Sequence, residues 1–128
     1  MNKTFILSIL LTSLIFMACC KEETRPSTIY ITANVTDKET ALPIDSVKVE
    51  LYKSDLATFP LIIKYYYTNK LGNVNLSFLP EKDSFGSYYL NFYKTGYLSS
   101  GAECGCEVHI DLDNENQNFN VQLTKIQQ

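Results

Sequence analysis

Apolar and polar residues alternate with a period of two along most of the chain from residue 28 onward. The segment 31–35 is a clear example, because Ile31, Ala33 and Val35 alternate with a threonine and an asparagine. Such alternation is typical of a β-strand that buries one face. No window of ten or more residues keeps the period of an amphipathic helix. Strands are therefore predicted at residues 29–36, 47–52, 61–68, 73–78, 88–93, 106–113 and 118–123.

Turn-forming residues separate the predicted strands. Pro43, Gly72 and Gly96 are among them, and they are assigned folding roles in the connections. Seven short strands joined by such turns predict an all-β fold, an antiparallel seven-stranded β-sandwich. About 100 residues can bury roughly 60 to 65% of the surface that the unfolded chain exposes. One domain over residues 28–126 is therefore expected, with no length left for a second.

The amino terminus has the layout of a secretory signal. Lys3 is followed by an apolar run from Phe5 to Met17 and then by the small residue Ala18. The run is too short for a transmembrane helix, which needs about 20 residues. Residues 1–18 are therefore interpreted as a signal peptide, and residues 19–27 as a tether.

The sequence Phe16-Met17-Ala18-Cys19 resembles the lipobox of bacterial lipoproteins, in which a peptidase cleaves before a cysteine that carries a diacylglycerol. The resemblance implies that Cys19 is the lipidated residue. Cys20 fits less well, because Cys19 would then occupy the position of the small residue. The competing interpretation is a soluble secreted protein whose cysteines merely lie near the cleavage site.

The residues Lys21, Glu22 and Glu23 follow the two cysteines directly. They resemble the signal that sends some lipoproteins to the outer face of the outer membrane, which implies a lipid-anchored protein at the cell surface. The alternative is a solvated charged tether. The formal net charge of −3 offers no patch for nucleic acid or for anionic headgroups, so the membrane partner is expected to be reached through the lipid alone.

Several landmarks of the folded part appear in a characteristic order. A turn from Asp37 to Ile44 precedes the strand Val47–Leu51, a Thr68-Asn69-Lys70-Leu71-Gly72 turn follows, and a later strand ends in Gly96-Tyr97. This order resembles the carboxypeptidase regulatory-like domain, over about residues 28–100. The resemblance implies a transthyretin-like, Ig-like Greek-key sandwich.

The enzyme that this fold would first suggest is a hydrolase of the hydroxyisourate hydrolase type. That family needs several histidines and an arginine, whereas this chain has one histidine, and its arginine, Arg25, lies in the tether. The chain also lacks a nucleophile elbow and a glycine-rich phosphate loop. A non-catalytic protein without a cofactor is therefore expected.

One group of chemically reactive residues stands near the carboxyl end. Cys104 and Cys106 could form a disulfide, remain inert thiols, or bind zinc or copper and act in redox chemistry. His109, Asp111 and Asp113 would share one face of the predicted strand 106–113, which is either a calcium-like or acid/base surface or an ordinary polar sheet face.

Tyrosines supply the remaining candidate site. Tyr89 and Tyr93 are predicted to face away from the core, and Tyr65, Tyr66 and Tyr67 run together. Exposed tyrosines suit recognition of a glycan or an envelope protein, although cross-strand pairing also explains them. The sequence thus favours a non-catalytic, membrane-anchored surface lipoprotein that acts as a binding or assembly module. The alternative is an envelope metal-binding or redox protein that uses the second cysteine pair.

Overall fold

The computed structural model describes residues 28–55, 59–81, 86–98 and 107–127. Every regular element within these ranges is a strand, as the alternating pattern predicts. The amino-terminal signal, the tether and the pair Cys104 and Cys106 lie outside the described residues. The strands are β1 (Ile29–Asp37), β2 (Lys48–Ser54), β3 (Leu61–Tyr67), β4 (Asn73–Phe78), β5 (Ser87–Tyr93), β6 (Val108–His109) and β7 (Asn116–Leu123).

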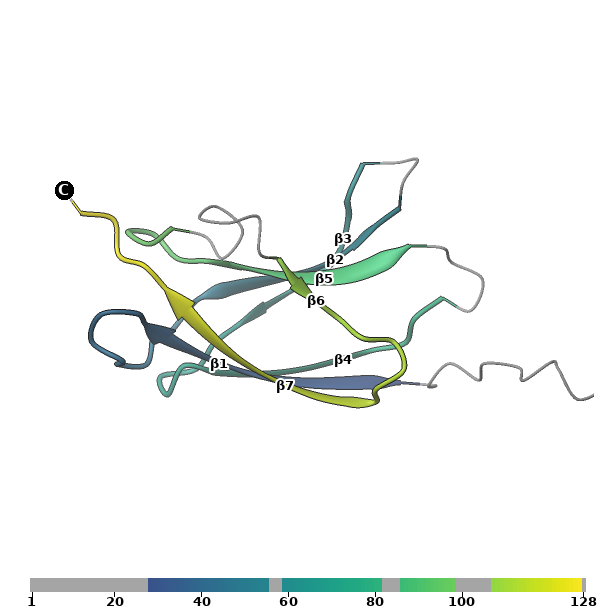
Figure 1. The fold of residues 1–128 in the computed structure, drawn as a ribbon, viewed down its shortest axis with the longest axis horizontal. Helices are drawn as coiled ribbons and strands as arrows, with labels where there is room; N and C mark the ends of the chain where they lie inside the picture. Colours follow the sequence, from purple (N-terminus) through teal and green to yellow (C-terminus); the bar gives the residue numbers. More distant parts are fainter. Residues whose placement is uncertain (1–27, 56–58, 82–85, 99–106, 128) are drawn as a thin grey trace, which may run out of the picture.

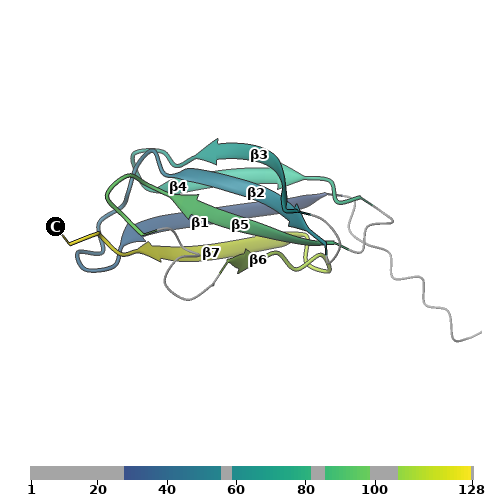
Figure 2. The same cartoon turned by 90° about the horizontal axis from the view of Figure 1, so that it is seen from above.

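The strands form two sheets that pack face to face as a sandwich (Figure 1). One sheet has three strands in the order β4-β1-β7, and the other has four in the order β3-β2-β5-β6. Figure 2 shows β3, β2 and β5 side by side in the second sheet. The all-β sandwich predicted from the sequence is confirmed.

One strand pair departs from the predicted antiparallel arrangement. β1 and β7 run parallel, with Ala33 opposite Phe119. The chain crosses between the sheets just before β7 and enters beside the start of β1, where the Tyr30 N–H donates to the Glu115 carbonyl at 2.7 Å. Residue alternation fixes which face of a strand is buried but not the direction of its neighbour, so the sequence could not indicate this pairing.

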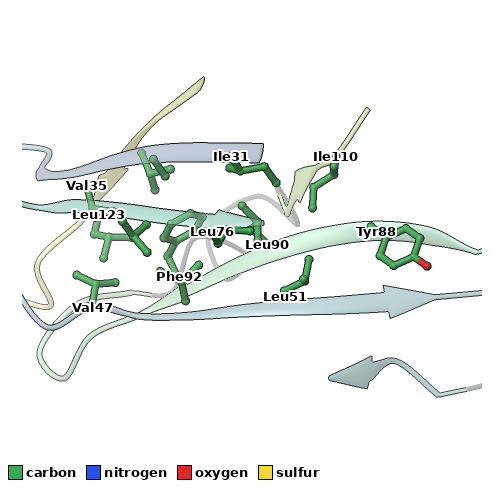
Figure 3. Packing of buried hydrophobic residues seen from close by; sticks show 14 of the residues in the cluster. Ile31, Val35, Val47, Leu51, Leu76, Tyr88, Leu90, Phe92, Ile110 and Leu123 are labelled. Atoms are coloured by element: carbon green, nitrogen blue, oxygen red, sulfur yellow. The ribbon is translucent and has the colours of Figure 1, made fainter. Parts of the chain in front are cut away.

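The core lies between the sheets and is built from the alternating apolar residues (Figure 3). On β1, Ile31 and Val35 are buried, while on β5 the buried residues are Tyr88, Leu90 and Phe92. The predicted inward faces of these strands are therefore confirmed. Burial of each large apolar side chain contributes about 1.5–3 kcal/mol before entropy is subtracted, which makes this continuous cluster the main source of stability.

The carboxyl-terminal candidate strand is shorter than predicted. Only Val108 and His109 form β6, because the chain turns at Asp111. The Asp111 carboxylate accepts the Asp113 N–H at 3.0 Å, and the buried Gln117 side chain bonds both the N–H and the carbonyl of Asp111. The proposed shared strand face of His109, Asp111 and Asp113 is therefore wrong, since the two aspartates lie in a turn.

The turn landmarks have the folding roles that the sequence predicts. Gly72 and Gly96 have positive φ angles of 72° and 84°, a region that side chains penalise. Thr68 is buried, where its hydroxyl donates to the Ile44 carbonyl at 2.8 Å and accepts the Val47 N–H at 2.9 Å. These contacts close one end of the sandwich.

Candidate functional site

The outer face of the four-stranded sheet gathers tyrosines and charged residues from three strands. Because residues opposite one another on neighbouring strands share a face, the register defines rows across this sheet. Tyr67 and Tyr93 flank Lys48 in one row, and Tyr65 and Asn91 flank Glu50 in the next. We call this surface the aromatic face; its members are Lys48, Glu50, Tyr52, Tyr65, Tyr67, Tyr89, Asn91 and Tyr93.

Lys48 lies at the start of β2, the strand between β3 and β5 on the aromatic face. Its ammonium nitrogen lies 5.2 Å from the ring centroids of both Tyr65 and Tyr93, within cation–π range. The same nitrogen lies 2.8 Å from the Glu50 carboxylate. This hydrogen bond to Glu50 raises the pKa of the Lys48 amine. A charged pair is therefore held between aromatic rings.

Tyr93 is fixed by its neighbours. Its hydroxyl oxygen accepts a hydrogen bond from the Asn91 amide at 3.1 Å. Burial, followed by the nearby Glu50 carboxylate, raises the pKa of the Tyr93 hydroxyl. A neutral phenol can both donate and accept hydrogen bonds.

Tyr89 forms a cross-strand pair, the second of the two interpretations that the sequence left open. Its ring stacks on that of Tyr52, with the two centroids 5.4 Å apart. The His109 ring lies edge-to-face with the Tyr89 ring, and their centroids are 5.2 Å apart. Tyr52 is only 4% exposed although it lies on the outer face, and burial raises the pKa of its hydroxyl. Tyr89 thus helps to cover a buried neighbour rather than standing as a free platform.

The sequence analysis named the run Tyr65, Tyr66 and Tyr67 as part of the aromatic candidate but did not say which of these rings are accessible. Tyr67 is 63% exposed and Tyr65 is 49% exposed, both on the aromatic face. Tyr66, between them, turns to the other side, where its hydroxyl donates to the Ser77 carbonyl at 3.3 Å. The signal that could have found them is the alternation within the tyrosine run, because residues 65 and 67 must share one face of a strand.

A shallow cleft adjoins the aromatic face at the end of β5. It has a volume of about 690 Å³, and its lining includes Lys48, Tyr93, Lys94 and Tyr97. The Lys94 ammonium donates to the Asp45 carbonyl at 2.8 Å, which holds the lysine at the cleft wall. The cleft offers phenol and ammonium groups next to the rings of the aromatic face.

The hypothesis of a metal site receives no support from the described residues. Within the described ranges, no three His, Cys, Asp or Glu side chains come together in a way that could hold a metal ion. The metal or redox alternative depends on Cys104 and Cys106, which lie outside these ranges, so it stays a prediction. In the part of the chain that the structure describes, no helix is long and apolar enough to cross a bilayer.

No protein-family model and no curated protein matches the chain. Solved structures do share its fold. A streptococcal ancillary pilin aligns with a TM-score of 0.55 and 15% identity, over 80% of this chain and 34% of the pilin. The shaft pilin SpaA from Lactobacillus rhamnosus GG aligns with a TM-score of 0.52 and 13% identity, over 79% of this chain and 47% of the pilin.

An enzyme shares the fold as well. The 3-chlorocatechol 1,2-dioxygenase from Rhodococcus opacus 1CP aligns with a TM-score of 0.51 and 14% identity, over 84% of this chain and 63% of the enzyme. This chain spans less than two thirds of each of these three proteins. At such identities the likeness establishes a β-sandwich fold and nothing about activity, because one fold serves many functions.

Proposed function

We propose that this chain is a non-catalytic binding or assembly module of the cell envelope, and that the aromatic face is its recognition surface. The observation that carries the proposal is the accessible pair Tyr65 and Tyr67 beside the Lys48–Glu50 ion pair. Flat rings supply apolar contact area, and the charged pair supplies a donor and an acceptor for polar groups of a ligand.

The arrangement of this face favours binding because much of it is already ordered. β2 is paired on both sides, to β3 and to β5, and Lys48 is held by two rings and one carboxylate. Side chains that are fixed before a ligand arrives lose little entropy when it binds. A glycan or an envelope protein fits this chemistry, since both present apolar surface together with hydrogen-bonding groups.

We also propose that lipid on Cys19 anchors the module in the outer membrane, facing outward. The lipobox-like segment ending at Cys19 and the following Lys21, Glu22 and Glu23 support this placement. Metabolic labelling with palmitate tests the anchor. Label is expected in the wild type and in Cys20→Ser, and its loss is expected in Cys19→Ser. Equal labelling of both variants would refute Cys19 as the acceptor, and failure of external protease to cut the protein on intact cells would refute surface display.

Binding is tested with an array of envelope polysaccharides and with a pull-down from envelope extract. We expect Tyr67→Ser to reduce retention of the ligand by roughly tenfold, the effect of losing about 1.4 kcal/mol of contact energy. Tyr30→Ser is the matched control, because Tyr30 is 56% exposed but belongs to the three-stranded sheet. Equal retention by the two variants would refute the aromatic face as the recognition surface.

A further inference from the structure

The strand β3 forms one edge of the four-stranded sheet. Among the described residues, its hydrogen-bonded neighbour is β2, and no strand pairs with its other side. Five of its seven residues are large apolar or aromatic side chains exposed by 44% or more, and they are Leu61, Ile62, Ile63, Tyr65 and Tyr67. An edge of this kind is a template for pairing with a further strand.

The ladder to β2 shows which backbone groups of β3 are free to pair. The Thr68 N–H donates to the Val47 carbonyl at 3.1 Å, just beyond the Lys48–Tyr67 pair. Successive residues of a strand direct their backbone groups to opposite sides. Tyr66 therefore faces β2, whereas the N–H and carbonyl groups of Tyr65 and Tyr67 face outward.

The other sheet edges are less suited to pairing. β6 contains only two residues, and β4 and β7 direct asparagine, serine and glutamine side chains to solvent. β3 alone among the described edges exposes apolar side chains on both of its faces. Its pairing with β2 shifts register between Leu51 and Tyr52, so one irregularity lies near Ile63. From Lys64 to Tyr67 the register is regular.

We infer that β3 pairs antiparallel with β3 of a second copy of this chain, which joins the two four-stranded sheets into one continuous sheet. The inference does not depend on the proposed ligand, because it rests on the edge of the sheet and not on its face. The lipid anchor proposed above, on which this step alone rests, would bring copies on one membrane to a high effective concentration, which favours such an association.

A register centred on Tyr66 satisfies the outward backbone groups of Tyr65 and Tyr67. In it, Tyr65 lies opposite Tyr67 of the second copy and Tyr67 lies opposite its Tyr65, so the outward N–H and carbonyl groups pair reciprocally. Both positions become aromatic cross-strand pairs, which stabilise sheets.

Charge does not oppose a second copy at this edge. Lys64 is the single charged residue of β3, and the register places it opposite Thr68 rather than opposite the other copy's lysine. Like charges directly opposite each other would destabilise the pair, and this register avoids them. The edge is therefore complementary to itself.

Co-purification of two differently tagged full-length copies, expressed together and solubilised in a mild detergent, tests the inference. The wild type is expected to recover its second copy. Tyr65→Pro removes an outward N–H without touching the ladder to β2, and it should reduce recovery by roughly tenfold or more. Tyr65→Thr is the matched control, since it also removes the ring but keeps the N–H and suits a strand.

Circular dichroism of both variants establishes that each remains folded. Absence of co-purification in the wild type would overturn the inference. Equal recovery by Tyr65→Pro and Tyr65→Thr would overturn it too, as would a wild type that captures a different protein through this edge and not its own copy. Tyr67→Ser keeps its outward N–H, so co-purification of this variant, measured beside its ligand retention, distinguishes failure of self-pairing from failure of the proposed function.

Discussion

The Tyr97 hydroxyl donates a hydrogen bond to Oδ2 of Asp37 at 3.0 Å and thereby ties the two sheets together. Asp37 ends β1 in the three-stranded sheet, and Tyr97 follows β5 of the other sheet. The second carboxylate oxygen of Asp37 accepts the N–H groups of Glu39 and Thr40, both at 2.9 Å. One buried carboxylate therefore orders the turn after β1 and fixes it to the opposite layer.

Removal of the Tyr97 hydroxyl should weaken this end of the sandwich. We expect Tyr97→Phe to lower the melting temperature by about 4–8 °C, the shift that the loss of one hydrogen bond of ~1 kcal/mol causes in a domain of this size. Thermal unfolding followed by circular dichroism measures it. Tyr30→Phe, an exposed tyrosine, is the control, and equal melting temperatures of the two variants would contradict the role of the bond.

The Asp37 carboxylate also makes stability depend on pH. The Thr40 backbone N–H, and then the Tyr97 hydroxyl, lower the pKa of Asp37 below its ordinary value in the folded chain. A lowered folded-state pKa means that the stabilisation is fully present above the unfolded pKa of about 3.9 and is lost as pH falls through the folded pKa.

Urea unfolding at a series of pH values tests this dependence. Asp37→Asn should be less stable than the wild type at pH 7, and the difference should shrink as the pH falls below about 4. A difference that stays constant from pH 7 to pH 2 would show that the carboxylate charge is unimportant.

Gly72 and Gly96 form a matched pair for testing backbone strain. A Cβ at Gly72 would lie 2.4 Å from the Val35 carbonyl oxygen, whereas a Cβ at Gly96 would meet nothing within 4 Å. The free energy of unfolding of Gly96→Ala should therefore fall only by the conformational cost of positive φ, about 1–2 kcal/mol.

Gly72→Ala should lower the free energy of unfolding by more than Gly96→Ala does, because the backbone must also move away from Val35. The Val35 carbonyl accepts the Ile44 N–H at 3.0 Å, so that movement disturbs a second contact. Denaturant unfolding of both variants gives the comparison. Equal destabilisation would mean that the close approach at Gly72 is relieved without cost.

The two kinds of tyrosine on the aromatic face should respond differently to substitution. Tyr89→Ser uncovers Tyr52 and removes a stacked pair, so we expect a loss of about 1–3 kcal/mol in stability. Tyr67→Ser removes an exposed ring and should change stability by less than about 0.5 kcal/mol. Unfolding free energies measure both, and a Tyr67→Ser variant as unstable as Tyr89→Ser would remove Tyr67 as a clean probe of binding.

The sequence was sufficient to predict most of the strands and their inward faces. Ile31, Leu90 and Val121 obey a strict alternation that only one buried face explains. The sequence did not predict the burial of Tyr52. This residue lies on the polar face of β2, and it is buried because the ring of Tyr89 stacks on it from the neighbouring strand β5. Such burial depends on register across strands, which a local pattern does not contain.

The candidate site was predicted in part for a related reason. Tyr93 was identified from its outward position on β5, and its place on the aromatic face agrees. Tyr65 and Tyr67 were named only within the run of three tyrosines and were not assigned to a face, because Lys64 alone interrupts the apolar and aromatic residues from Leu61 to Tyr67. Their place beside Lys48 and Glu50 follows only from the register of β3 with β2.

The central claim is that the aromatic face binds an envelope ligand, and hydroxyl-radical footprinting tests it most directly. The full chain is modified alone and in the presence of envelope extract, and modification of individual tyrosines is compared by mass spectrometry. We predict that the extract protects Tyr65 and Tyr67, while Tyr30 on the other sheet remains as reactive as before. Unchanged modification of Tyr65 and Tyr67, or protection of Tyr30 in their place, would contradict the claim.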